Sequence, residues 1–535
     1  MSFAPRRRPS TPCPAAPGRR HRPRAVLCAV LACAAGLVAV AAPGGRAWAA
    51  GVVLNGTGSS FAAPAIETWT ADVHQPPYSI TLNYSSSSSG QGRYEFTNQT
   101  TDFAASDTGY VSGSVGTTPP SFPFIFVPIT AAGVAFMYDI PGLSKTLQLS
   151  SYTACAVMTG GITNWDDSHI AADNPGVSLP NLTIKPVTES DTAGTNYVLE
   201  EWCIAEQPAL WAAFAQHEQT QSGGPTDGVP ISQTSPTSNW PGILPNGLDD
   251  SSTTAVAGDI ATNPGAIGAV QLQYAVDDGF TGSNPAKAVA SVKNASGAYT
   301  QPTPVDVASA LAYATQLPDG THKLDFNGVG AHVYNPSTYS YLLSPTTGWP
   351  ASKGAVMSAF VNYVLTLGQQ KAPSRGYASL GLSLERYGIN AVTADVPGAV
   401  AVTSAENAAY ACGDLTPTDV AAGRTTPTCG VTNVTAPLPP PNGGNGGKAT
   451  SAAKTGAKSS SGHSATGSGG SGAGVATAPG GVAGADPGVA LTGQVPLATT
   501  GIDPVPIVLS GAALVGVGWW MRRRLLRVRP ADKGR

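Results

Sequence analysis

The stretch that decides the fold is GVVLNGTGSSFAAPAIETW, at residues 51–69. A short apolar strand at 51–54 enters a Gly/Ser turn, and a helix follows. Ile66, Trp69 and Val73 repeat in this helix at the spacing of one helical face, so we expect them to point into a core.

The polar residues of the turn suit the start of that helix. We expect Ser60 to be the N-cap, because a serine hydroxyl there accepts a hydrogen bond from a free backbone N–H. Pro64 then falls in the first turn, where a missing N–H costs least.

The same order returns twice by residue 107. Residues 80–84 (ITLNY) alternate as a strand does and lead into five serines and Gly90, and 101–107 (TDFAASD) is a third strand that ends in a turn. Strand, small-residue turn and helix in repetition predict an α/β fold with a parallel sheet. Such sheets bind ligands beyond the carboxyl ends of their strands, where N–H groups of helix starts attract anions. The alternative is that these serines serve only as caps and loops.

The chain opens with the order of a secretory signal. Seven Arg within the first 24 residues precede an apolar run at 25–42, and Ala47-Trp48-Ala49 forms a small-x-small site. We expect cleavage after Ala49, which makes 1–49 a signal peptide and the protein a secreted one. The alternatives are an uncleaved membrane anchor, because the apolar run is long for a signal, and a lipoprotein attached through Cys33.

The carboxyl end has three parts. Residues 435–496 are rich in Pro, Gly and Ser and contain no aromatic side chain, so they predict a disordered spacer. LATTG follows at 497–501. An apolar run at 505–521 is just long enough for a transmembrane helix, and the Arg-rich tail after it would stay in the cytoplasm.

Residues 497–535 resemble the sorting signal that sortases read, in the Leu-Ala-x-Thr-Gly variant of high-GC Gram-positive bacteria. The resemblance implies cleavage between Thr500 and Gly501 and attachment to the cell wall, with sortase and the wall as partners. A plain single-pass membrane anchor is the alternative. In both cases the folded part faces outward at the cell surface.

Charge is unevenly distributed along the chain. Residues 1–49 and 502–535 hold 15 of the 29 basic residues but only two of the 32 acidic ones, which leaves 50–501 with a net charge of −16. This excludes nucleic acid as a partner, since binding it needs a basic face. The chain has no GxSxG or HExxH motif and its His residues are scattered. We therefore predict no catalytic residue, no metal and no cofactor, and a protein that is not an enzyme.

Four cysteines remain after the predicted cleavage: Cys155, Cys203, Cys412 and Cys429. An even number in an exported chain suggests disulfides. Cys412 and Cys429 are close in a turn-rich segment, and Cys155 with Cys203 is the complementary pair. The sequence leaves the pairing open.

Between 51 and 395 the chain resembles the phosphate-binding proteins of ABC transporters. Beyond the opening stretch, NYSSSSSGQG and TDFAASD, the matching blocks are AGVAFMYDIPG, GGITNWDDSHIAADNPGVSLPNLTI, ESDTAGTNYV, NPGAIGAVQLQYA and SRGYASL. The resemblance implies a two-lobed periplasmic-binding-protein (Venus-flytrap) fold over 50–434. We expect one lobe at 51–128 and 343–410, and the other at 129–342.

The resemblance also implies a phosphate site between the lobes. Its motif positions fall on Ser60, Phe61, Ser89, Asp107, Gly194 and Thr195. Asp107 matches the carboxylate that accepts a hydrogen bond from the phosphate proton, by which such sites prefer phosphate to sulfate. The alternative is that Asp107 is a turn-capping carboxylate at a strand end.

Two positions depart from the family's pattern, because Glu189 and Ala193 replace the usual Arg and Ser. Unit charges 4 Å apart at an effective dielectric constant of 20 interact by about 4 kcal/mol, so the change to Glu189 matters for an anion. The nearest basic residue to a site loop is Arg93. It is either a cation that approaches the anion or a solvated helix residue.

Two functions follow from this sequence. The first is a surface receptor that binds phosphate or a related oxyanion for uptake, with a phosphate ABC permease as partner. The alternative is a wall-anchored adhesion or scaffold module that keeps the fold but has lost tight phosphate binding.

Overall fold

A computed structural model describes residues 51–220, 231–241, 244–401 and 413–426. The predicted signal peptide, spacer and sorting signal lie outside the described residues, as do Cys412 and Cys429. No helix in the described part of the chain has the length and apolar character of a membrane span.

The first strands confirm the predicted α/β order. β1 (Val53–Gly58) lies between β2 (Thr81–Ser86) and β3 (Phe103–Ser106), and all three are parallel. A helix follows each of the first two strands, α2 (Ala63–His74) after β1 and α3 (Ser89–Thr97) after β2.

The start of α2 differs from the prediction. Its N-cap is Ala62, and Ser60 does not cap it. Instead the hydroxyl of Ser59 accepts a hydrogen bond from the Ala62 N–H at 2.9 Å, which stabilises the turn one residue earlier than expected. Pro64 lies in the first turn, as predicted. Three apolar residues of this helix are buried, also as predicted: Ile66, Trp69 and Val73.

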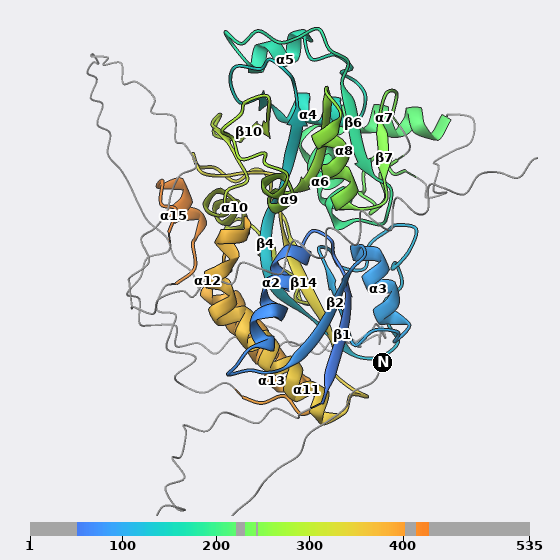
Figure 1. Cartoon of the computed structure of the whole chain (residues 1–535), viewed down its shortest axis with the longest axis vertical. Coiled ribbons are helices and arrows are strands. Elements are labelled where there is room, and N and C mark those ends of the chain that lie inside the picture. The colour runs from blue at the N-terminus through green and yellow to red at the C-terminus, as the bar shows by residue number, and fades with distance from the viewer. Residues whose placement is uncertain (1–50, 221–230, 242–243, 402–412, 427–535) are drawn as a thin grey trace, which may run out of the picture. The chain divides into compact units, whose positions relative to one another are not determined.

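One long strand joins the two halves of the main sheet. The first part of β4 (Phe124–Asp139) pairs with β14 (Ser337–Pro345), which also pairs with β3. From Val134 onward β4 pairs with strands of the second half. Figure 1 shows β4 passing from the half with β1, β2 and α3 to the half with α6, α7 and α8. We call these halves the first and second lobe.

The second lobe continues the sheet in the order β8, β6, β7. Its strands are β6 (Lys185–Glu189), β7 (Leu248–Asp250), β8 (Ala266–Gln271) and β9 (Lys287–Val289). β6 is parallel to both of its neighbours, so the α/β pattern recurs here. The lobe boundaries predicted at 128/129 and 342/343 fall inside β4 and β14.

The remaining elements cover the sheet or form small additions to it. The helices are α4 (Ser151–Met158), α5 (Ser168–Asp173), α6 (Gly194–Glu206), α7 (Pro208–Thr220), α8 (Thr253–Thr262), α9 (Leu272–Asp277), α10 (Pro304–Leu311), α11 (Ala351–Tyr363), η1 (Val364–Gly368), α12 (Gln369–Lys371), η2 (Ala372–Arg375), α13 (Leu382–Asp395) and α15 (Pro417–Ala421). The short strands are β5 (Gln148–Leu149), β10 (Ser291–Lys293), β11 (Tyr299–Thr300), β12 (Thr315–Gln316) and β13 (His322–Lys323).

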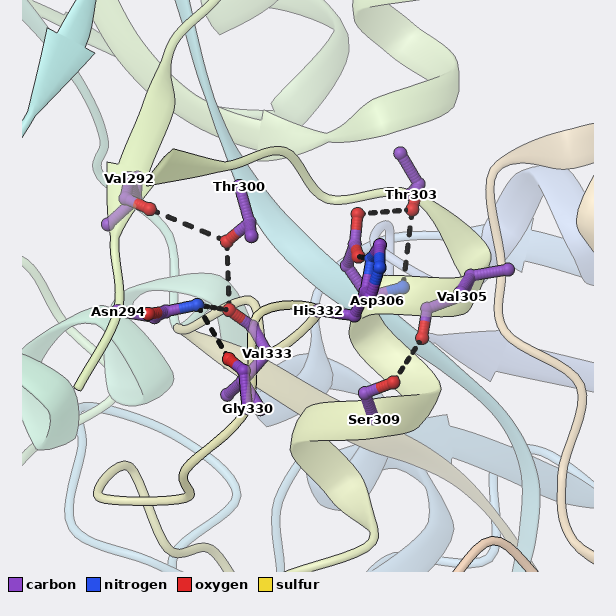
Figure 2. A network of polar contacts seen from close by, with 10 residues as sticks. All are labelled: Val292, Asn294, Thr300, Thr303, Val305, Asp306, Ser309, Gly330, His332 and Val333. Carbon is purple, nitrogen blue, oxygen red and sulfur yellow. Dashed lines mark hydrogen bonds and ion pairs between the residues drawn. The ribbon is translucent and has the colours of Figure 1, made fainter. Parts of the chain in front are cut away.

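A disulfide and a polar network tie the second lobe together. Cys155 in α4 is bonded to Cys203 in α6, one of the two pairs that the sequence left open. In the network around α10, Asp306 accepts a hydrogen bond from the Thr303 hydroxyl at 2.6 Å and lies 3.1 Å from His332 (Figure 2). The neighbouring Val333 carbonyl accepts from the Thr300 hydroxyl in the same view. These bonds hold the segment that leads into β14.

Candidate anion-binding site

Four strands end at the same place in the structure. β1, β2 and β3 of the first lobe run into small-residue turns, and β6 of the second lobe ends at Glu189. The carboxyl ends of the parallel strands β1, β2 and β3 share one edge of the first lobe's part of the sheet. β6 runs in the opposite direction in the second lobe, so its carboxyl end faces theirs and side chains of the four turns meet there.

Asp107 lies at the centre of the first-lobe part. Its carboxylate is 3% exposed and accepts hydrogen bonds from three serine hydroxyls. They are Ser59 at 2.7 and 2.8 Å, Ser89 at 2.8 Å and Ser340 at 2.5 Å. Burial raises the pKa of Asp107 above its ordinary value, while these hydrogen bonds and the charge of Arg93 oppose the rise.

Two glycines permit the close approach of the chain segments around Asp107. Gly58 has φ +128°, and a Cβ there would lie 2.1 Å from the Ala105 carbonyl oxygen, so no other residue fits. Gly194, at the start of α6, brings the second lobe against the first. A Cβ on Gly194 would lie 2.4 Å from Asp107 Oδ2 and 2.8 Å from Ser89 Oγ.

A chain of hydroxyls connects the first lobe to Glu189. The Ser60 and Thr253 hydroxyls are 2.9 Å apart, and Thr253 donates to Glu189 Oε1 at 2.9 Å. The Tyr274 hydroxyl donates to the Ser60 carbonyl at 2.8 Å. Ser60 therefore does lie at the site, but beside Glu189, whereas Ser59 is the neighbour of Asp107.

Several buried polar atoms here have no partner among the described residues. They are Glu189 Oε2, Asp191 Oδ1 and the Thr195 hydroxyl. Glu189 is 2% exposed, and burial raises its pKa to about 7, with a further contribution from the charge of Asp107. Burial and then the charge of Glu189 raise the pKa of Asp191 as well. Unsatisfied buried polar groups are rare in folded proteins, so each of these atoms calls for a partner such as a water, an ion or a ligand.

The start of α6 offers free donors. Its N-cap, Ala193, has only a methyl side chain and cannot accept from the first turn, and no side chain among the described residues caps the helix. The first N–H groups of the helix, from Gly194 and Thr195 onward, suit an anion. The loss of the family's serine at 193 thus removes one hydroxyl but leaves the amides.

Arg93 is buried, which excludes the interpretation as a solvated helix residue. Its guanidinium is 0% exposed and donates to the Gly116 carbonyl, Ser106 Oγ and Thr108 Oγ1, each at 2.8 Å. Arg93 thereby holds the residues on either side of Asp107, and its positive charge lowers the pKa of the Asp107 carboxyl. Burial lowers the pKa of Arg93 to about 10, so it remains a cation near neutral pH.

The structure thus brings together Ser60, Ser89, Asp107, Gly194 and Glu189, all named from the sequence. The ring of Phe61 instead points into the core, and only its backbone lies near the turn, where its carbonyl accepts from Tyr377. Three polar neighbours were missed: Ser59, Thr253 and Ser340. Thr253 is the first helical residue of a further strand-turn-helix passage at 248–262, so its position had a readable signal. Ser340 lies within the buried strand β14 and had none.

The lobes touch at several points beside the site. The Gly90 N–H donates to the Thr192 carbonyl at 2.8 Å, and the Ser114 and Thr192 hydroxyls are 2.8 Å apart. Asn239 Oδ1 accepts from the Ser114 N–H at 2.6 Å. With Gly194 packed on Asp107, a tetrahedral anion needs the lobes to part before it can enter.

A cavity of about 650 Å³ opens elsewhere, between α10, η2 and the start of α13. Apolar side chains such as Leu311 and Leu380 line it together with the buried Glu385. None of the polar residues at the converging strand ends lines this cavity, so the candidate site rests on the strand ends alone.

The class of protein follows from the fold and the site. Two α/β lobes share a sheet through the long strand β4, and polar residues of both lobes meet between them, which is the arrangement of a two-lobed periplasmic-binding-protein fold. A family model described as the PBP superfamily domain matches residues 44–366. This is more than half of the 535 residues, and the chain belongs to that family.

Named relatives are phosphate-binding proteins. The chain is 26% identical over 335 residues to the phosphate-binding protein PstS of Xylella fastidiosa, covering 62% of this chain and 82% of that protein. It is 32% identical over 180 residues to the phosphate-binding protein PstS 2 of Mycobacterium tuberculosis, covering 32% of this chain and 46% of that one. A solved phosphate-binding protein from Stenotrophomonas maltophilia matches with 19% identity and a TM-score of 0.49, covering 65% of this chain and 96% of that chain.

Proposed function

We propose that this protein is an exported receptor that binds phosphate between its lobes for uptake by an ABC permease. The observation that carries the proposal is the buried Asp107 carboxylate ringed by hydroxyl groups, with the bare start of α6 against it. Asp107 would accept the proton of the anion, while the amides at Gly194 and Thr195 would donate to its other oxygens. Only a protonated oxyanion suits a carboxylate acceptor, which favours phosphate over sulfate.

Isothermal titration of the purified full-length chain with inorganic phosphate and with sulfate tests this function. We expect saturable heat with phosphate and much weaker binding of sulfate. Asp107→Asn should reduce the preference, because an amide donates as well as accepts. Absence of binding to both anions between pH 5.5 and 8 would refute the receptor function.

The buried Glu189 supports a second function, an adhesion or scaffold module without a ligand. A carboxylate in place of the family's arginine weakens anion binding unless it is neutralised. Titration separates the two functions, since the module would give no heat with phosphate while keeping its fold by circular dichroism.

We also propose that LATTG at 497–501 anchors the protein to the cell wall through sortase cleavage between Thr500 and Gly501. The support is the order of spacer, pentapeptide, apolar run and basic tail. Wall fractionation of a Thr500→Ala variant tests this anchor. Normal retention of the variant in the wall fraction would contradict sorting at this pentapeptide.

A further inference from the structure

The two carboxyl oxygens of Glu189 differ in their hydrogen bonds. One carboxyl oxygen, Oε1, accepts from Thr253. The other, Oε2, is buried and accepts nothing from the described residues. A buried acceptor of this kind is stabilised by a proton, by a donor on a ligand, or by one shared between them.

The titratable groups of the described elements around Glu189 are acids and a tyrosine, and hydroxyl groups lie beside them. Its own loop presents Asp191, and the end of β3 presents the charge of Asp107. α8 contributes the Thr253 hydroxyl, the turn after β1 contributes Ser60, and α9 contributes Tyr274.

No described cation makes up this deficit. The guanidinium of Arg93 donates its short hydrogen bonds to acceptors of the first lobe. In the second lobe it contacts the Ser238 hydroxyl, at 3.5 Å. An oxyanion that enters the site therefore meets a carboxylate where the family places an arginine.

We propose that the site takes up its oxyanion together with one additional proton, held in a hydrogen bond between the Glu189 carboxyl and an anion oxygen. This inference rests on the proposed function and specifies its ligand as the singly charged, dihydrogen form of phosphate. The complex forms from three components: the protein with an ionised Glu189, a doubly charged hydrogen phosphate ion and one proton from solvent. Apart from this proton transfer, no covalent bond forms or breaks.

In this complex each of the two carboxyl groups forms a hydrogen bond with one of the two protons of the ligand. Asp107 accepts one proton of the anion, and Glu189 shares the other. The two remaining anion oxygens face the donors of the second lobe, including the unpartnered Thr195 hydroxyl. Burial already raises the pKa of Glu189, and a bound anion raises it further, so the complex holds this proton more tightly than the free protein does.

The test is titration of the full-length chain with inorganic phosphate at pH 8 in two buffers of different ionisation enthalpy. At that pH, free phosphate is mainly the doubly charged ion. We expect uptake of about one proton per phosphate and a Kd that weakens about tenfold per pH unit between pH 7.5 and 8.5. Glu189→Gln, which is always neutral, should bind with almost no proton uptake and with a nearly flat pH dependence.

A control variant sharpens the comparison. Glu201→Gln removes a half-buried glutamate whose pKa burial raises to about 7, but two turns into α6 and away from the anion, so proton uptake should persist. If Glu189→Gln does not fold, the proton uptake measured for the wild type still decides.

The outcomes separate this inference from the proposed function. Tight phosphate binding with less than about 0.3 protons taken up at pH 8 would overturn the inference and leave the receptor function standing. Uptake that survives in Glu189→Gln would overturn it too. No phosphate binding at any pH would overturn both.

Discussion

Glu189→Arg offers a direct way to measure what the unusual acid does. The Glu189 oxygen lies 2.9 Å from the Thr253 hydroxyl, which lies 2.9 Å from that of Ser60. An anion whose oxygen hydrogen-bonds to the side chain at position 189 has its centre of charge about 5 Å from the charge of that side chain. At an effective dielectric constant of about 20, two unit charges at this distance interact by about 3 kcal/mol.

Relative to a neutral, protonated Glu189, an arginine should therefore strengthen binding by about 3 kcal/mol, or somewhat more than 100-fold in Kd. The new cation also faces Asp107 and Asp191, whose carboxylates offset the cost of burying it. Since arginine does not change its protonation state near neutral pH, the pH dependence attributed to Glu189 should disappear as well.

Titration of the full-length variant with inorganic phosphate at pH 8 is the assay. Asp166→Arg is the matched control, because it makes the same change in net charge in an exposed turn before α5. It should shift Kd by less than about threefold, since salt screens distant surface charges. A folded Glu189→Arg protein whose affinity equals that of the wild type would refute the placement of the anion beside position 189.

Three further predictions concern stability, measured by urea denaturation. Arg93→Met should lower the free energy of unfolding by about 3–5 kcal/mol, because three buried acceptors would lose their hydrogen-bond donor. A loss below about 1 kcal/mol would contradict a structural role for the guanidinium. Replacing both Cys155 and Cys203 by Ala should cost about 4 kcal/mol, since the bond closes a separation of 48 residues, and an unchanged midpoint would argue against it. Burial raises the pKa of Glu385 to about 8, so its contribution to stability is complete below its unfolded-state pKa and is lost as the pH rises through 8. Glu385→Gln should therefore flatten the decline of the free energy of unfolding between pH 5 and 8. An unaltered slope would count against this role of Glu385.

Much of the fold was readable because its signals are local. The apolar spacing of Ile66, Trp69 and Val73 marked the buried face of α2, and repeated strand-turn-helix passages marked parallel strands. The start of α2 was misplaced because two adjacent serines compete for the same turn. Ser59 rather than Ser60 accepts the backbone N–H there.

The site was harder to read, because its neighbours come from distant segments. Ser340 reaches Asp107 from a crossing strand 233 residues later in the chain, and no local pattern signals that contact. Arg93 looked like a surface residue because α3 is polar on most sides. Its acceptors at Ser106, Thr108 and Gly116 become visible only once the loops fold over it.

The central claim is that an oxyanion binds where the ends of β1, β2, β3 and β6 meet. A crystal structure of the full-length chain grown with inorganic phosphate tests it most directly. We expect a tetrahedral anion with oxygens about 2.5–3.2 Å from the Asp107 carboxylate, the Ser89 hydroxyl and the first N–H groups of α6. Density for phosphate at another place, or none at this junction under saturating phosphate, would contradict the claim.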